Sequence, residues 1–187
     1  MSFGLRHCLL CGAVLEAWSC PYCILPFEKQ YCLGERKGVL KELVNVYKYQ
    51  SVHVVADVFV ELILQTFDFD NDAVFVPLPT ISKHVRERGF GHIEYLLRRL
   101  SWDDGQRLAC AKVLKRVNST VQVGSSSEKR KTQAAKAYEL VKNFNPNKHF
   151  ILVDDVWTTG SSMLAAAQKM RSQGAQKVDI LVITKTV

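Results

Sequence analysis

Apolar side chains recur at helical spacing in two neighbouring segments of the chain. Between Gly38 and Tyr49 an apolar stripe falls on one helical face; it consists of Val39, Leu40, Leu43, Val44, Val46 and Tyr47. Further on, Asp57, Glu61 and Gln65 recur at every fourth residue of an otherwise apolar segment. That spacing gives a second helix a single polar face. The pattern therefore predicts two consecutive amphipathic helices.

Short apolar runs elsewhere in the chain have the length and composition of buried strands. They are Ala73–Val76, Leu108–Leu114, Phe150–Val153 and Val178–Thr184. Helical patterns lie between them, at Ile93–Leu100 and Ser162–Ser172. A polar loop, Gly124–Lys129, leads into a further predicted helix that Ser126 or Ser127 caps. Strand, helix and apolar strand in succession predict parallel βαβ units, and so an α/β fold with a mostly parallel, Rossmann-like sheet flanked by helices.

The beginning of the chain follows neither periodicity and is rich in cysteine instead. Cys8-Leu-Leu-Cys11 and Cys20-Pro-Tyr-Cys23 form two C-x-x-C pairs, separated by eight residues. Each pair presents two thiolates from a tight turn, and two such turns close a tetrahedral Zn²⁺ site. Disulfides or a redox motif are the alternatives, but no secretion signal is evident and a redox C-x-x-C does not come doubled. We predict a structural zinc ribbon over residues 1–33 and an α/β domain over residues 34–187.

Two further cysteines lie outside these pairs. Cys110 follows Leu108 and Ala109, and we expect its side chain to lie in the core. Cys32 is interpreted as incidental, although a role as a substitute zinc ligand stays open.

The 187-residue chain is 48% hydrophobic and carries a net charge of +7, which is unevenly distributed. Residues 1–100 balance eleven basic against eleven acidic side chains, whereas residues 101–148 hold ten Lys and Arg against four Asp and Glu. Such a block suits a polyanion, either nucleic acid or a phosphorylated metabolite, but a solvated basic face explains it equally well. No apolar run approaches the length of a membrane span, so we expect a cytoplasmic protein, with peripheral attachment to the inner face of the membrane left open.

The segment Ile151 to Ser162 contains the most informative chemistry. Two acids, Asp154 and Asp155, stand at the carboxyl end of the predicted strand, where ligands bind in open α/β sheets. A loop without Lys or Arg follows; it consists of Thr158, Thr159, Gly160, Ser161 and Ser162. Backbone amides, hydroxyls and the start of a helix hold a phosphate without a cation. Because carboxylates repel phosphate but accept hydrogen bonds from hydroxyls, the pattern predicts a sugar phosphate as ligand.

The string VDDVWTTGSS resembles the 5-phosphoribosyl-1-pyrophosphate (PRPP) signature of type I phosphoribosyltransferases. The resemblance implies that Asp154 and Asp155 bind the ribose hydroxyls. It implies that the 5′-phosphate is held by Thr158, Thr159, Gly160, Ser161 and Ser162. Mg²⁺ would bridge the pyrophosphate, whose charge needs it.

The whole chain, from about Cys8 to Thr184, resembles the ComF competence proteins, including their ComFC and GntX-like members. The features that carry this resemblance are the cysteine pairs, Val76-Pro77-Leu78-Pro79, Arg86-Glu87-Arg88-Gly89-Phe90, and a later stretch with Gln122, Arg130, Gln133 and Tyr138. Gly91 and His92 stand where the family usually has Asn and Gln, and Gln133 replaces Asn.

Cationic side chains around Gly89 and at Arg130 are the other candidates for anion binding. Lys83, Arg86 and Arg88 lie within six residues of one another, and we expect them to bind pyrophosphate or a DNA backbone. The alternative is a solvated turn with Phe90 packed in the core. Neither His84 nor His92 has an evident partner in the sequence, and we assign neither a catalytic role.

Two functions remain open at this stage. The ComF resemblance implies a competence protein for natural transformation that aids the uptake of single-stranded DNA into the cytoplasm and works with a ComF-type helicase. The basic block from Arg107 to Lys148 favours this, although Tyr138 and Phe144 are its only aromatic residues for base stacking. Alternatively, the intact acid pair and loop indicate an active phosphoribosyltransferase that transfers ribose 5-phosphate from PRPP to a base or another nucleophile. The sequence identifies no acceptor pocket, so enzymatic turnover stays open.

Overall fold

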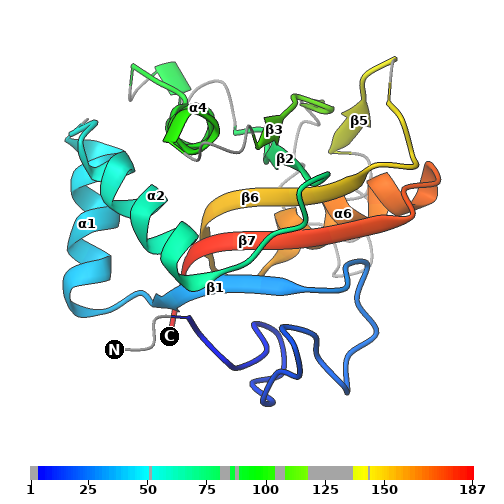
Figure 1. Cartoon of the computed structure of the whole chain (residues 1–187), viewed down its shortest axis with the longest axis horizontal. Helices are drawn as coiled ribbons and strands as arrows, with labels where there is room; N and C mark the ends of the chain where they lie inside the picture. The colour runs from blue at the N-terminus through cyan, green and yellow to red at the C-terminus, as the bar shows by residue number, and fades with distance from the viewer. Residues whose placement is uncertain are drawn as a thin grey trace, which may run out of the picture.

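A parallel β-sheet forms the centre of the molecule (Figure 1). The computed structural model describes residues 4–50, 52–80, 85–86, 89–103, 108–117, 137–142 and 144–187. Within them, the five-stranded sheet has the order β1-β7-β6-β2-β3. These strands are β1 (Gln30–Glu35), β2 (Val74–Pro77), β3 (Ala109–Cys110), β6 (His149–Trp157) and β7 (Lys177–Lys185). A separate antiparallel ribbon pairs β4 (Leu114–Arg116) with β5 (Tyr138–Leu140).

Helices cover both faces of the sheet (Figure 1). On one face lie α1 (Gly38–Tyr49), α2 (Val55–Thr66) and α4 (His92–Asp103), and on the other lies α6 (Ser161–Ser172). The two cores follow from the alternation of side chains along a strand. In β6, Ile151 and Val153 pack towards the three-helix face, whereas Phe150 and Leu152 pack towards α6. The predicted α/β class with a mostly parallel sheet is confirmed.

The predicted elements differ from the observed ones mainly where pairing with a distant strand determines the bounds of a strand. The apolar run Leu108–Leu114 is not one strand, because β3 pairs with β2 in the main sheet and β4 pairs with β5 in the ribbon. The prediction that Cys110 lies in the core is also wrong, because this residue is exposed on β3, an edge strand. Strand β1 was not predicted at all. The polar loop Gly124–Lys129 and the helix expected after it lie outside the described residues.

The cysteine-rich segment packs against both cores, with Trp18 against Tyr31 and Phe67 on the three-helix side. Leu9 and Phe27 are buried in the core that contains α6, and Phe27 meets the Trp157 ring edge-on at 6.4 Å. Gln30, the first residue of β1, accepts a hydrogen bond from the Leu9 backbone through Oε1 at 2.8 Å. The division into domains 1–33 and 34–187 stays a prediction, and β1 runs across that boundary as part of the main sheet.

Candidate functional site

The candidate site lies at the carboxyl end of β6, where the strand passes into α6. Gly160 precedes the helix with φ +73°, a conformation that L-residues other than glycine rarely adopt. A Cβ atom at this position would lie 2.1 Å from the Trp157 ring. Trp157 is itself buried in the α6 core, so the ring cannot easily withdraw. The close approach of this glycine to Trp157 therefore fixes the path of the loop.

The loop encloses a small cavity of about 70 Å³ in front of the α6 amino terminus. Its lining includes Asp154, Val182 and the run Trp157 to Met163. Thr159 and Ser161 hold each other by a hydrogen bond of 2.7 Å between their hydroxyl oxygens, so their orientation is fixed. Gly160, the N-cap residue of α6, has no side chain to cap the helix, and the Ser161 backbone N–H donates a long hydrogen bond of 3.4 Å to Oγ1 of Thr159. The cavity has the size and the donor chemistry for a phosphate group.

Asp154 and Asp155 are consecutive residues of β6 and belong to opposite faces of the sheet. Asp154 lines the cavity beside α6, and its Oδ1 accepts the backbone N–H of Asp155 at 2.9 Å. Asp155 lies on the three-helix face and is only 5% exposed. The predicted assignment of both acids to ribose hydroxyls stays a prediction, and the two have different surroundings.

Asp155 is held by two cationic or ionisable side chains from different helices. Nζ of Lys48 in α1 lies 2.6 Å from Oδ2 of Asp155, and Nε2 of His92 in α4 lies 2.7 Å from the same oxygen. Burial alone would raise the pKa of the Asp155 carboxyl, but the hydrogen bond with His92 and the charge of Lys48 outweigh it and hold the pKa well below its usual range. Asp155 is therefore ionised, and α1, α4 and β6 meet at one carboxylate.

The ribbon β4–β5 adds a cation and a phenol beside the loop. Arg116 donates a hydrogen bond from Nη1 to the Tyr138 hydroxyl at 3.2 Å, and its guanidinium lies 5.6 Å from the centre of the Tyr138 ring. Tyr138 is buried, which raises the pKa of its phenol, and the side chain of Ser162 lies beside it. The phenol thus stays protonated and links the cation of Arg116 to the loop between β6 and α6.

The remaining predicted anion-binding residues are only partly described. Arg86 is exposed next to the turn at Gly89. Lys83, Arg88 and Arg130 lie outside the described residues, as does His84. Phe90 is half-buried and packs against Tyr47, 5.8 Å between ring centres.

Sequence reasoning missed Lys48, His92 and Arg116. For His92, the interpretation that it has no evident partner was wrong, because it pairs with Asp155 from 63 residues away. A usable signal was present in the strand alternation. If Asp154 faces a ligand, Asp155 faces the core, and a buried carboxylate needs a cation.

The four predicted zinc ligands come together as one cluster. The Sγ atoms of Cys8, Cys11, Cys20 and Cys23 all lie within 4.8 Å of one another, and those of Cys11 and Cys20 are 3.6 Å apart. In a tetrahedral site with Zn–S bonds of about 2.3 Å, neighbouring sulfurs are about 3.8 Å apart. Cys32 is buried elsewhere, with its Sγ 3.4 Å from the Gly34 carbonyl oxygen, and is not part of the cluster.

The thiols of this cluster compete for protons. Burial acts to raise the pKa of Cys8, but hydrogen bonds from the Cys11 and Leu10 backbone, together with Cys20 and Gln30, outweigh it and lower the pKa to about 7. For Cys23, the hydrogen bond with Cys11 and then burial raise the pKa to about 12. Four crowded thiols cannot all ionise without a cation between them, and this donor set fits Zn²⁺.

Comparison with known families gives this geometry a context. Residues 85–186, more than half of the chain, match the phosphoribosyl transferase domain. The chain belongs to the phosphoribosyl transferase domain family. The matched part of this phosphoribosyl transferase domain protein contains the loop, Asp154, Asp155 and His92, but not Lys48 or the cysteine cluster.

Two curated proteins resemble the chain over most of its length. Competence protein F of Haemophilus influenzae is 25% identical over 190 residues, which cover 93% of this chain and 82% of the relative. DNA utilization protein YhgH of Salmonella typhi is 26% identical over 174 residues, covering 87% of this chain and 74% of the relative. The predicted resemblance to the ComF competence proteins is thereby confirmed.

Solved structures overlap with the chain more loosely. A hypoxanthine phosphoribosyltransferase from Staphylococcus aureus is 10% identical, with a TM-score of 0.38, and covers 79% of this chain and 74% of its own. Adenine phosphoribosyltransferase from Leishmania tarentolae is 11% identical, with a TM-score of 0.43, and the match covers 84% of this chain and 78% of that protein.

None of the helices in the described part of the chain has the length and apolar character that a bilayer crossing requires.

Proposed function

We propose that this protein is a competence protein for natural transformation whose phosphoribosyl transferase domain binds PRPP together with Mg²⁺. The observation that carries the ligand assignment is the cavity at the end of β6, where the amino terminus of α6, preceded by Gly160, meets Asp154. An anion site and a hydroxyl acceptor lie side by side there, as a phosphorylated sugar requires. The names of the two relatives support the role in DNA uptake.

In the proposed complex the 5′-phosphate occupies the loop cavity. It accepts hydrogen bonds from the first amides of α6 and from the hydroxyls of Thr158, Thr159, Ser161 and Ser162. Gly160 allows the backbone to approach the phosphate closely, because it has no Cβ. The ribose hydroxyls donate to Asp154, which lines the cavity, whereas Asp155, on the opposite face, holds the end of β6 in place through Lys48 and His92.

The charges around the site favour an anionic ligand despite the two acids. Lys48 neutralises Asp155 internally, so Asp155 adds little repulsion at the cavity. Arg116 lies on the other side of the loop and reaches it through Tyr138. Bound Mg²⁺ would neutralise the charge of the pyrophosphate. We propose that Arg86, with Lys83, Arg88 and Arg130, binds the pyrophosphate or a DNA backbone.

We further propose that the cysteine cluster binds one structural Zn²⁺ through Cys8, Cys11, Cys20 and Cys23. The close approach of the four sulfurs supports this. Because Leu9 lies inside the first cysteine pair and is buried beneath α6, the ion would hold the ribbon against the main domain.

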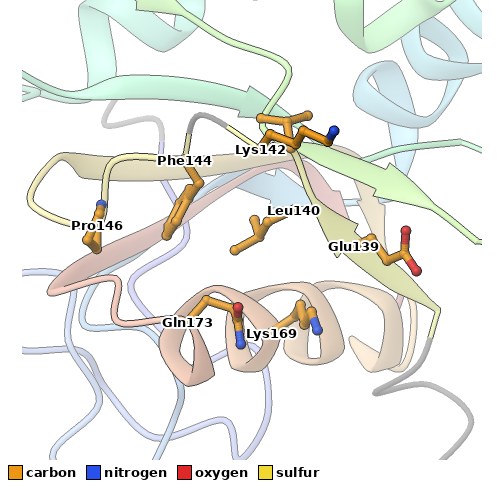
Figure 2. Close-up of a pocket in the computed structure, with 8 residues that line it drawn as sticks. Glu139, Leu140, Lys142, Phe144, Pro146, Lys169 and Gln173 are labelled. Carbon is orange, nitrogen blue, oxygen red and sulfur yellow. The ribbon is translucent and has the colours of Figure 1, made fainter.

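Single-stranded DNA is the proposed macromolecular ligand, and a groove between β5 and α6 is the proposed contact surface. Figure 2 shows Lys142 and Phe144 on one side of this groove and Lys169 and Gln173 on the other. The groove has a volume of about 410 Å³. Phe144 is half-buried and stacks on Phe150 at 5.1 Å, which holds its ring in place. Lysines for phosphates and a fixed aromatic ring are the elements of a single-strand site. A helicase of the ComF type is the proposed partner in uptake.

A second candidate function is transfer of ribose 5-phosphate from PRPP to a base or another nucleophile. The intact loop and the ionised acid at the end of β6 favour it. Pyrophosphate release from PRPP, measured with and without candidate bases, separates binding alone from turnover.

The DNA part of the proposal is tested by fluorescence anisotropy of a labelled poly-dT oligonucleotide at low salt. Wild-type protein should bind, and K142E/K169E should weaken binding at least about tenfold, because counterion release dominates such affinities. The exposed lysine Lys41 on α1 offers a matched control, K41E, which should bind like the wild type. Absence of binding by the wild type would reject the DNA role and leave the PRPP site to be judged separately.

A further inference from the structure

A second cluster of ligand-type side chains lies at the opposite, amino end of the same strands. It consists of Asp70 and Asp72, in the segment before β2, and His149, the first residue of β6. One carboxylate oxygen from each acid and one ring nitrogen of the histidine lie within 4.8 Å of one another. Both acids are exposed, whereas His149 is 5% exposed. The cluster therefore has an open side for entry and a buried, fixed side.

The orientation of His149 is set from behind by a buried carboxylate. Nε2 of His149 lies 2.8 Å from Oδ2 of Asp179 in β7, which is fully buried. Oδ1 of Asp179 accepts the Lys29 backbone N–H at 2.9 Å, so Asp179 is itself fixed. An ionised carboxylate only accepts, and Nε2 must therefore carry the proton and donate it. This carboxylate–histidine pairing is the arrangement that orients metal-binding histidines in proteins.

The other ring nitrogen, Nδ1, faces the two acids. It is buried and makes no hydrogen bond to any described residue, although Oδ2 of Asp70 lies only 3.2 Å away. With the proton on Nε2, Nδ1 presents a lone pair towards a carboxylate oxygen. Two such atoms repel each other unless a proton or a cation lies between them.

Lys177 supplies part of the missing positive charge. Its Nζ forms an ion pair with Oδ2 of Asp70, and this pair lowers the pKa of the Asp70 carboxyl. The Lys177 side chain is 40% exposed and can turn to solvent, since a flexible surface ammonium is held weakly by one carboxylate. This ion pair leaves Nδ1 of His149 without a hydrogen bond to any described residue.

We propose that Asp70, Asp72 and His149 form a binding site for a divalent transition metal ion such as Mn²⁺ or Zn²⁺. One imidazole nitrogen and two carboxylate oxygens form a borderline donor set, which suits these ions better than Mg²⁺ or Ca²⁺, whose ligands are oxygens. Solvent would complete the coordination on the exposed side. This site lies away from the PRPP cavity and is independent of the proposed function.

The ion would join three segments at the amino edge of the sheet. The acids hold the connection from α2 to β2, His149 begins β6, and Asp179 extends the network into β7. Because binding to the folded state alone stabilises it, Mn²⁺ should raise the melting temperature of the chain.

The proposal is tested by titrating zinc-loaded, full-length protein with Mn²⁺ alone. Binding is measured by isothermal calorimetry and by NMR of the histidine rings. We expect one Mn²⁺ per chain, selective broadening of the His149 ring signals, and at least about tenfold weaker binding in D70N and in D72N. D68N, an exposed acid of the same segment outside the cluster, serves as the matched control and should bind like the wild type. D154N excludes binding at the PRPP cavity.

Three results would overturn the proposal. They are absence of Mn²⁺ binding by the wild type, unchanged binding in the D70N/D72N double variant, and loss of binding in D154N with the His149 signals unaffected.

Discussion

Nε2 of His92 lies 2.7 Å from Oδ2 of Asp155, and both side chains are buried between α4 and the end of β6. Lys48 from α1 reaches the same oxygen. The carboxylate next to Asp154 is thus the point at which two helices of one face are fixed to the strand that carries the candidate site. The candidate loop and the packing of α1 and α4 therefore meet at two consecutive acids, Asp154 and Asp155.

Replacing Lys48 by Met should destabilise the protein strongly. It leaves Asp155 buried with only His92 as partner, and breaking a buried ion pair from one side costs about 3 kcal/mol. Urea denaturation measures the loss, with K41M on the exposed face of α1 as control. The double variant K48M/D155N should recover most of the stability, because both charges are gone. Equal stability of K48M and K41M would contradict the role of the pair.

Asp155 should also contribute to the acid sensitivity of the fold. Its pKa is lower in the folded chain than the value of about 3.9 in an unfolded one. Such a group stabilises the fold fully above pH ~4, and the contribution is lost as the pH falls through the folded pKa. Between about pH 5 and pH 2, the free energy of unfolding should therefore fall more steeply for wild type than for K48M/D155N. Lys177 also lowers the pKa of the Asp70 carboxyl, but this contribution to the pH dependence is the same in both proteins and cancels in the comparison. Parallel curves would be inconsistent with this assignment.

Gly160→Ala should abolish ligand binding for two reasons. The new Cβ would clash with the buried Trp157 ring, and the positive φ of this position is unfavourable for alanine. Gly38→Ala is the matched control. Gly38 has φ +51° but nothing lies within 4 Å of a Cβ there, so the variant should cost only the backbone strain, about 1 kcal/mol. Calorimetric titration with PRPP and Mg²⁺ checks the first effect and thermal melting checks the second. PRPP affinity unchanged in Gly160→Ala would contradict the loop's proposed role.

Cys20→Ser should remove the bound zinc and loosen the ribbon. Metal analysis should give about one Zn²⁺ per wild-type chain and much less in the variant, since a structural site needs all four thiolates. Proteolysis should then cut between residues 4 and 29 first. Cys110→Ser, on the exposed edge strand β3, provides the control and should retain its zinc. Equal zinc content in the two variants would argue against the cysteine site.

The sequence predicts most of the fold because periodicity is a local property. The stripe from Gly38 to Tyr49 and the polar face at Asp57, Glu61 and Gln65 reappear as α1 and α2. Strand β1 escaped prediction because its sequence, QYCLGE, contains glycine and adjoins the cysteine segment; its pairing with β7 is a tertiary event.

The site could be predicted only where it is contiguous in sequence. The loop from Thr158 to Ser162 and Asp154 were found because they follow one strand. Lys48 and His92 come from helices that only folding brings to Asp155, and neither residue has a local pattern that marks it. The cysteine cluster, by contrast, was predictable because its two pairs are close in sequence and have the spacing of a four-cysteine metal site.

The most direct test of the central claim is the response of the backbone amides of Gly160, Ser161 and Ser162 to PRPP and Mg²⁺ in a ¹H–¹⁵N correlation spectrum. Binding of the 5′-phosphate at the α6 amino terminus should shift these three signals most, in a saturable manner, and D154N should weaken the titration at least about tenfold. Saturable PRPP binding that leaves the three amides unshifted, or no binding at all, would contradict the assignment of this loop as the phosphoribosyl site.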